Sequence, residues 1–180
     1  MDYLLKGLDK LEKAKGDYLF WAADAYYTLS LIYEDRKDNN KATASYAKSE
    51  ALYEESYQGQ YDNVYMDFLR SASLFYAKNN NYAKAFERAD KVYQYLVTVG
   101  ESGSLQAFYQ LLNIAEINYL TKRYPEAIAY CNNALLTVNA KMKDGITLLD
   151  SVKMEVFKPK AILINAKAEY ELRETAIPLF

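Results

Sequence analysis

The chain has 180 residues, of which 51% are hydrophobic and 26% are charged, a balance typical of one folded domain or a short repeat array. The formal net charge is −2 and no block of Lys and Arg stands out, so we expect no nucleic-acid binding. The sequence contains no apolar run of the roughly 20 residues that span a bilayer, and its start lacks the basic and apolar segments of a signal peptide. We therefore expect a cytoplasmic protein without membrane insertion.

Most catalytic and metal-binding chemistry is excluded by two counts. The chain has no histidine and a single cysteine, Cys131. Without histidine, neither a Ser-His-Asp nor a Cys-His arrangement can form, and one cysteine provides neither a zinc site nor an internal disulfide. No glycine-rich phosphate loop is present. We therefore predict that the chain is not an enzyme, that it binds no cofactor or metal, and that Cys131 is a buried core thiol.

An apolar stripe opens the chain. It consists of Leu4, Leu5, Leu8 and Leu11. This spacing predicts a short N-terminal helix over residues 1–15, which packs on the element that follows. The same stripe could instead pair two copies of the chain in a homo-dimer.

Turn residues then divide the chain at regular intervals. One set of glycines, at positions 16, 59, 100 and 145, is spaced by 43, 41 and 45 residues. A second set of turns, which begin at Asp38, Asn79 and Lys122, lies between them with spacings of 41 and 43 residues. The chain is thus cut into helical segments of about 20 residues, two to each repeat.

Two landmarks inside these segments recur with the same period. In the first helices the recurring positions are Tyr26, Leu29, Ser30 and Tyr33, then Leu69, Ala72, Ser73 and Tyr76, then Leu111, Ile114, Ala115 and Asn118. In the second helices they are Ala42 and Tyr46, then Ala85 and Ala89, then Ala127 and Cys131. Both landmarks shift by 43 and then 42 residues, which indicates a true repeat.

The pattern resembles the tetratricopeptide repeat, in which an aromatic residue, a small residue and a second aromatic mark the first helix and an alanine marks the second. Three features depart from that family: the period is about 42 residues rather than about 34, no proline closes a repeat, and Asn118 stands where an aromatic is usual. The resemblance implies an all-α fold, an α-α superhelix or solenoid of antiparallel helix pairs. Its longer period implies about one added turn in each helix.

The residue types agree with close helix packing. The small residues of both landmarks let paired helices approach closely, while aromatic rings fill the wider spaces beside them. Many of the 19 tyrosines are therefore expected to be structural. We assign this role to Tyr26, Tyr33, Tyr46, Tyr76 and Tyr82.

The repeats and the end of the chain give the expected organisation. An N-terminal helix occupies 1–15, three repeats occupy 17–58, 60–100 and 103–143, a long connection occupies 144–158, and a half repeat or capping helix occupies 159–180. Pro159 is expected in the first turn of that last helix. Two alternatives remain for it: the helix caps the array, or the chain is a piece of a longer protein in which more repeats or an effector domain follow.

The resemblance also implies a concave surface lined by the first helices. The expected partner-binding residues on it are Tyr27, Leu31, Glu34, Arg70, Leu74, Lys78, Tyr109, Asn113 and Glu116. Such a mixed surface suits an amphipathic helix or an extended segment with a few apolar anchors. Some family members bind a terminal carboxylate with paired Lys and Asn residues. Here only Arg70 and Asn113 are similar to that clamp, so we do not predict that ligand.

These expectations favour a protein-interaction scaffold whose partner is a protein or peptide. An alternative is the N-terminal sensory or regulatory arm of a larger multidomain protein that carries a protease, kinase or DNA-binding domain. A third is a stand-alone chaperone or assembly factor that dimerises through its N-terminal stripe.

Overall fold

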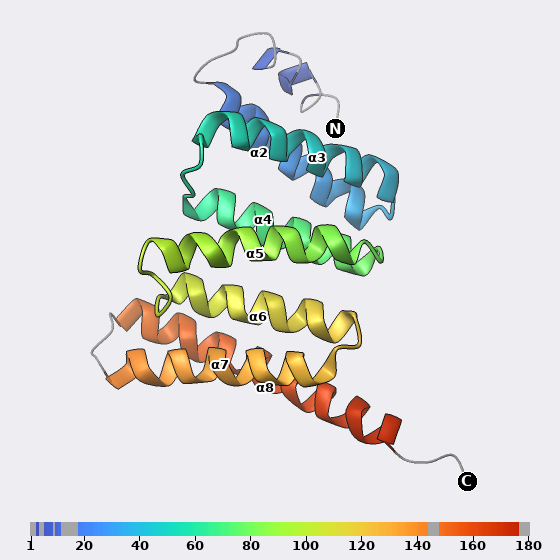
Figure 1. Cartoon of the computed structure of the whole chain (residues 1–180). Helices are drawn as coiled ribbons and strands as arrows, with labels where there is room; N and C mark the ends of the chain where they lie inside the picture. Colours follow the sequence, from blue (N-terminus) through green and yellow to red (C-terminus); the bar gives the residue numbers. More distant parts are fainter. Residues whose placement is uncertain (1–2, 4–5, 9, 12–17, 144–147, 177–180) are drawn as a thin grey trace. The chain divides into compact units, whose positions relative to one another are not determined.

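A computed structural model describes residues 3, 6–8, 10–11, 18–143 and 148–176 (Figure 1). Its labelled helices are α2 (Leu19–Asp35), α3 (Asn39–Tyr57), α4 (Asn63–Lys78), α5 (Tyr82–Thr98), α6 (Leu105–Leu120), α7 (Tyr124–Lys143) and α8 (Leu148–Ala176). No strand occurs in these ranges, and neighbouring helices pack in pairs. The predicted all-α class is therefore confirmed.

The chain divides into two compact units, residues 1–69 and 70–180. The boundary lies inside α4 rather than in a loop between two helix pairs. The first half of α4 belongs with α2 and α3 because its Tyr65 and Phe68 rings lie 5.2 Å and 5.1 Å from the ring of Tyr53 in α3. These rings tie the start of α4 to the first pair.

The same turn joins the two helices of each pair. Lys37, Asn80 and Lys122 each have φ of 60°, at positions that repeat with the period of the sequence landmarks. In each turn the following amide donates to a carbonyl five residues back, as from Asn81 to Tyr76 at 2.8 Å, which satisfies the helix end. Asp38 and Asn81 then cap the next helix by accepting from the amide three residues on.

A cluster of aromatic rings forms the core of the 1–69 unit. Tyr46, Tyr53, Tyr65 and Phe68 are all buried. Tyr57 stacks on Tyr65 with 5.5 Å between ring centroids and an interplanar angle of 5°. Offset and edge-to-face contacts of this kind add to the free energy gained by burying the rings. The predicted structural role of Tyr46 is therefore confirmed.

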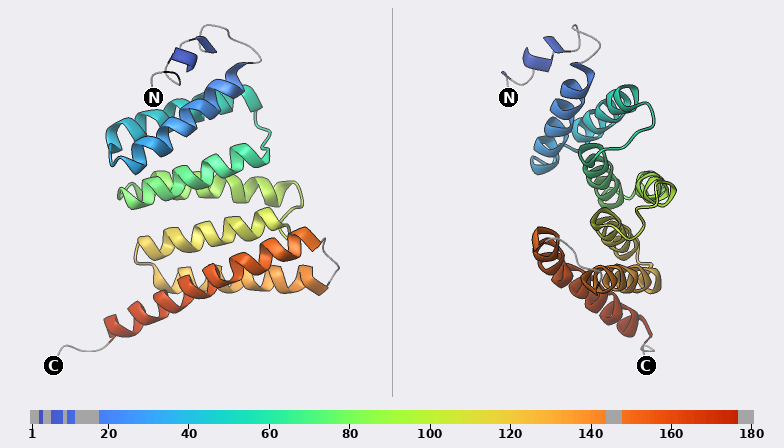
Figure 2. Two further views of the ribbon diagram at one scale, coloured as in Figure 1. Left: turned by 180° about the vertical axis from the view of Figure 1, so that it is seen from behind. Right: turned by 90° about the vertical axis from the view of Figure 1, so that its left-hand side faces the viewer.

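Helix α6 lies at the centre of the 70–180 unit, in contact with α5, α7 and α8 (Figure 2). Phe108 and Leu111 of α6 pack with Ala134 of α7 and Ala161 of α8 in one buried cluster. The thiol-bearing Cys131 of α7 packs in a second cluster with Ala115 and Ile164. The prediction that Cys131 is buried is confirmed.

The small residues of the repeat lie where the sequence pattern placed them. All six are fully buried: Ser30, Ser73, Ala115, Ala42, Ala85 and Ala127. The structural tyrosines are less uniform. Tyr76 is buried and Tyr26 and Tyr33 are half-buried, but Tyr82 is exposed at the start of α5, where its hydroxyl donates to Asn80. The prediction of a structural packing role for Tyr82 was wrong, because 39% of its surface is exposed.

Replacing Ala85 with leucine should destabilise the 70–180 unit. Ala85 is fully buried in α5, so the larger side chain forces neighbouring side chains or the backbone to shift, at a cost of about 1–3 kcal/mol. A thermal melt followed by circular dichroism measures the change. Ala129→Leu, at an exposed position of α7, is the matched control and should leave the melt nearly unchanged. Equal melts for both variants would contradict close packing at Ala85.

Helix α8 differs from the expectation for the end of the chain. Pro159 lies inside a helix that already begins at Leu148, so the segment 148–158 is helical and not a connection, and Pro159 is not in the first turn. Contacts on both sides of the proline hold the helix in place, since Phe157 packs on Tyr109 and Ala161 lies in the core. These contacts offset the hydrogen bond that proline cannot donate.

The N-terminal stripe is only partly within the described residues. Leu8 is buried and Leu11 is half-buried, while Leu4 and Leu5 lie outside the described residues, as do Gly16 and Gly145. Because Leu8 is already buried within a single copy, it is not an open dimer contact. A dimer through this stripe stays a prediction.

Candidate functional site

The three predicted partner-binding residues of the 1–69 unit lie on α2. Leu31 is 42% exposed, whereas Tyr27 and Glu34 are half-buried. The Tyr27 ring lies edge-on to Phe68 at 5.4 Å, and Glu34 accepts a hydrogen bond of 3.1 Å from the hydroxyl of Tyr46. Burial, aided by the charge of Glu34, raises the pKa of Tyr46, so that hydroxyl stays a donor. Leu31 is thus the residue of this group that is open to a partner.

In the 70–180 unit, Arg70 of α4 is buried and bonded to α6. Its Nε donates to Gln110 Oε1 at 3.2 Å, and one terminal nitrogen donates to the backbone and side-chain oxygens of Gln106 at 3.2 Å and 2.7 Å. Gln110 in turn donates to the carbonyl of Ala89 in α5 at 2.6 Å. A charged group is stable in such a place only when its donors are satisfied. Arg70 therefore positions α6. The prediction that it faces a groove was wrong, because its guanidinium is buried against α6.

An aromatic pair lies next to this guanidinium. The Tyr109 ring is 5.9 Å from the Arg70 guanidinium carbon, within cation–π range. On α8, the Phe157 ring meets Tyr109 edge-to-face with centroids 4.8 Å apart. Tyr109 is half-buried and Phe157 is exposed. We call Arg70, Gln106, Tyr109, Gln110 and Phe157 the Arg70 cluster.

Asn113 and Glu116 are also engaged inside this unit. Asn113 is buried and its Nδ2 donates to the hydroxyl of Ser73 at 2.8 Å, while that hydroxyl donates to the carbonyl of Arg70 at 2.7 Å. Glu116 forms an ion pair with Lys160 of α8, with 2.7 Å between Oε2 and Nζ. The prediction that Asn113 faces a groove was wrong, because its amide connects α6 to α4.

The last two predicted residues, Leu74 and Lys78, follow Arg70 along α4 at intervals of four. Leu74 is half-buried and Lys78 is exposed. Residues spaced by four lie on one face of a helix. Leu74, Lys78 and Tyr109 are therefore the predicted residues of this unit that remain accessible to a partner.

Three residues of the Arg70 cluster were not predicted from the sequence to belong to a site. Gln106 and Gln110 lie one turn apart on α6, and no role was predicted for either. Phe157 falls in the segment expected to be a connection. Only the spacing of the two glutamines on either side of Tyr109 could have indicated a shared role.

Within the described ranges, no group of histidine, cysteine, aspartate and glutamate side chains could hold a metal ion. None of the described helices is long and apolar enough to cross a membrane. Comparisons of this chain with protein-family models, with curated proteins and with solved structures give no match.

Proposed function

We propose that this chain is a protein-interaction scaffold of the tetratricopeptide type, whose first helices bind a partner protein or peptide. The observation that carries the proposal is the Arg70 cluster. It presents the rings of Tyr109 and Phe157 on adjacent helices, and hydrogen bonds to the two glutamines hold the guanidinium beside them. Aromatic residues that are held rigidly are typical anchors of protein interfaces, because little conformational entropy is lost when a partner binds. The buried Arg70 supports Tyr109 from behind and is not itself a proposed contact.

The partner that suits these residues is an amphipathic helix or an extended segment with apolar anchors. Leu74 adds a half-buried aliphatic side chain on α4, one turn after Arg70, and Lys78 adds a positive charge in the last turn of that helix. A partner segment whose apolar side chains are followed by a carboxylate would complement the apolar residues and Lys78. A cytoplasmic location, in a protein without catalytic or cofactor chemistry of its own, is part of the same proposal.

Leu31→Glu and Leu74→Glu test this assignment. Each places a charge among apolar contacts, so captured partners should be lost or bound at least about tenfold more weakly in affinity capture followed by titration. Leu136→Glu on α7, at a leucine that is 65% exposed, and Val97→Glu on α5 are matched controls that should leave binding unchanged. Arg70 is unsuitable for this test because it is buried. The same partners bound equally by all four variants would contradict binding by the first helices.

A second candidate is the regulatory arm of a larger multidomain protein. The outer face of α8 supports it: Leu163 and Tyr170 are 53% and 61% exposed, although their counterparts in α4, Leu69 and Tyr76, are buried. Further helices or another domain would cover such a face. The coding sequence tests this candidate, since a stop codon directly after Phe180 would contradict it.

A further inference from the structure

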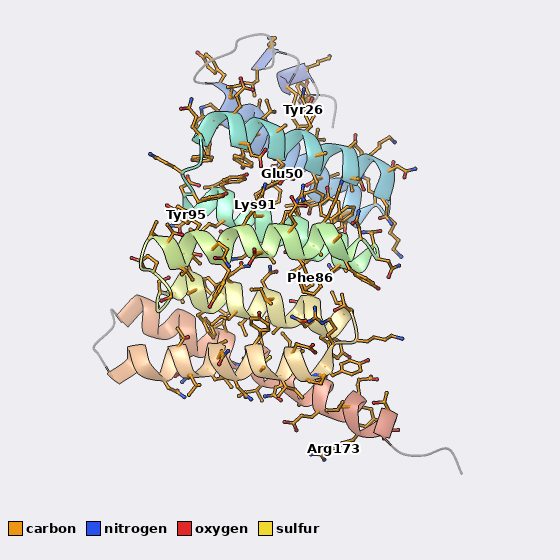
Figure 3. All side chains as sticks on the ribbon, viewed as in Figure 1. Tyr26, Glu50, Phe86, Lys91, Tyr95 and Arg173 are labelled. Atoms are coloured by element: carbon orange, nitrogen blue, oxygen red, sulfur yellow. The ribbon has the colours of Figure 1, made fainter. Side chains whose placement is uncertain are left out.

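A cavity of about 480 Å³ lies between α5, α6 and α7 in the 70–180 unit. Its walls include Phe86, Glu87 and Asp90 of α5, Asn118 of α6 and Tyr130 of α7. Figure 3 shows Phe86 on the side of α5 next to α6. Ile114 and Asn118, the α6 residues that line the cavity, lie on the opposite side of the helix from Tyr109. The cavity is therefore distinct from the Arg70 cluster.

The cavity lies where the third pair lacks an aromatic ring. Asn118 occupies the position held by Tyr33 in the first pair and Tyr76 in the second. In those pairs a cation from the second helix lies over the ring, with Lys41 Nζ 5.6 Å from the Tyr33 centroid and Lys84 Nζ 5.2 Å from the Tyr76 centroid. Asparagine is shorter than tyrosine, and Asn118 lines the cavity together with Tyr130 of α7.

A cation is nevertheless present at the cavity. The guanidinium carbon of Arg123 lies 5.3 Å from the centroid of Phe86, and both residues line the cavity. Arg123 also pairs with Glu126 at 3.1 Å on the exposed side. A second ring placed against this guanidinium would gain the cation–π attraction that the tyrosines of the other pairs already have.

The polar groups at the cavity favour a ligand that donates hydrogen bonds. Asn118 is 1% exposed, and its Oδ1 has no hydrogen-bond partner among the described residues, while its Nδ2 donates to the carbonyl of Ile114 at 2.9 Å. Such an acceptor costs free energy until a donor reaches it. Glu87 and Asp90 also line the cavity, each with one carboxylate oxygen already engaged, by Arg88 at 2.6 Å and by Gln94 at 3.2 Å, which leaves the second oxygen of each as an acceptor.

We propose that this cavity binds a phenolic ring. The ring takes the place of the tyrosine missing at position 118 and packs between Arg123 and Ile114. Its hydroxyl donates to Asn118 Oδ1, after a small rotation of the amide, or to a neighbouring carboxylate. An engineered cavity left by a deleted side chain binds benzene, which shows that a space of suitable shape accepts a small aromatic ring. The phenol could come from a free small molecule or from a tyrosine of a partner chain.

Titration of the isotope-labelled chain with p-cresol, followed by NMR shifts of the Asn118 and Tyr130 signals, tests the proposal. We expect binding with Kd on the order of 1 mM, as for a ligand of this size. Toluene, which lacks the hydroxyl, should bind at least about tenfold more weakly. A blocked tyrosine, acetylated and amidated, distinguishes the sources: binding as tight as p-cresol indicates a partner's tyrosine, and much weaker binding indicates a free phenol.

Asn118→Tyr restores the ring and should abolish p-cresol binding while the thermal melt is unchanged or higher. Ala83→Trp fills the cavity from an exposed position of α5 and should have the same effect, even if Asn118→Tyr folds poorly. Ala129→Trp, outside the cavity, is the matched control. The proposal would be overturned if wild type and both filled variants bound p-cresol equally, if toluene bound as tightly as p-cresol, or if p-cresol did not bind. None of these outcomes bears on the function proposed for the first helices.

Discussion

Phe108→Ala is expected to lower the free energy of unfolding of the 70–180 unit by about 3–5 kcal/mol, the range for a buried phenylalanine that leaves a cavity. Phe108 is fully buried and contacts residues of α6, α7 and α8 in one cluster. Its cluster neighbours include Leu111 and Ala134, and the cost of the lost ring depends on how far such neighbours collapse into the space.

Urea denaturation followed by circular dichroism measures this effect. Tyr170→Ala removes a ring of similar size from an exposed position of α8 and should change the free energy of unfolding by no more than about 0.5 kcal/mol. If the two variants unfold at the same urea concentration, Phe108 is not a core residue and the central place of α6 in this unit is wrong.

Cys131 is expected to react at least about 100-fold more slowly with iodoacetamide in the folded chain than in urea at pH 8. Burial raises the pKa of its thiol to about 11 from an ordinary value near 9. The thiolate is the reactive form, and two pKa units lower its fraction about 100-fold. The side chain is also 0% exposed, so iodoacetamide reaches the thiol only when the surrounding structure opens locally.

The rate of mass increase measures this reactivity. A chain with Ser102→Cys in a Cys131→Ala background provides the control, because Ser102 is exposed in the loop before α6 and should label at the rate of a free thiol. Labelling of folded wild type at that same rate would show that Cys131 is accessible, and would contradict the packing of α7 on α8.

Parts of the fold could be predicted from spacing alone. The small residues at Ser30, Ser73 and Ala115 recur with a constant period, and all three are fully buried. A helix places residues three and four apart on one face, so a repeated apolar pattern determines which side of each segment is packed. The turns at Asp38 and Asn81 were predictable for a similar local reason, since their side chains cap the helix that follows directly.

The site residues were less predictable, because their surroundings come from distant parts of the chain. Arg70 and Asn113 lie on helix faces that suggested a solvent-facing groove. Arg70 bonds to Gln110 and Asn113 bonds to Ser73, each 40 residues away in the sequence. Periodicity describes the polarity of a face but not whether a polar group on it meets a partner from another helix. Leu31, without such a partner, remains exposed as predicted.

The sequence by itself determined the all-α class, the period near 42 residues and the packed side of the helices, because these depend on local spacing. Only the tertiary structure decided that α8 runs through Pro159, that Arg70 is internal, and that a cavity opens beside Asn118. Each of these depends on which side chains of other helices fill the neighbouring space. That information lies in the packing between helices and not in the pattern within one.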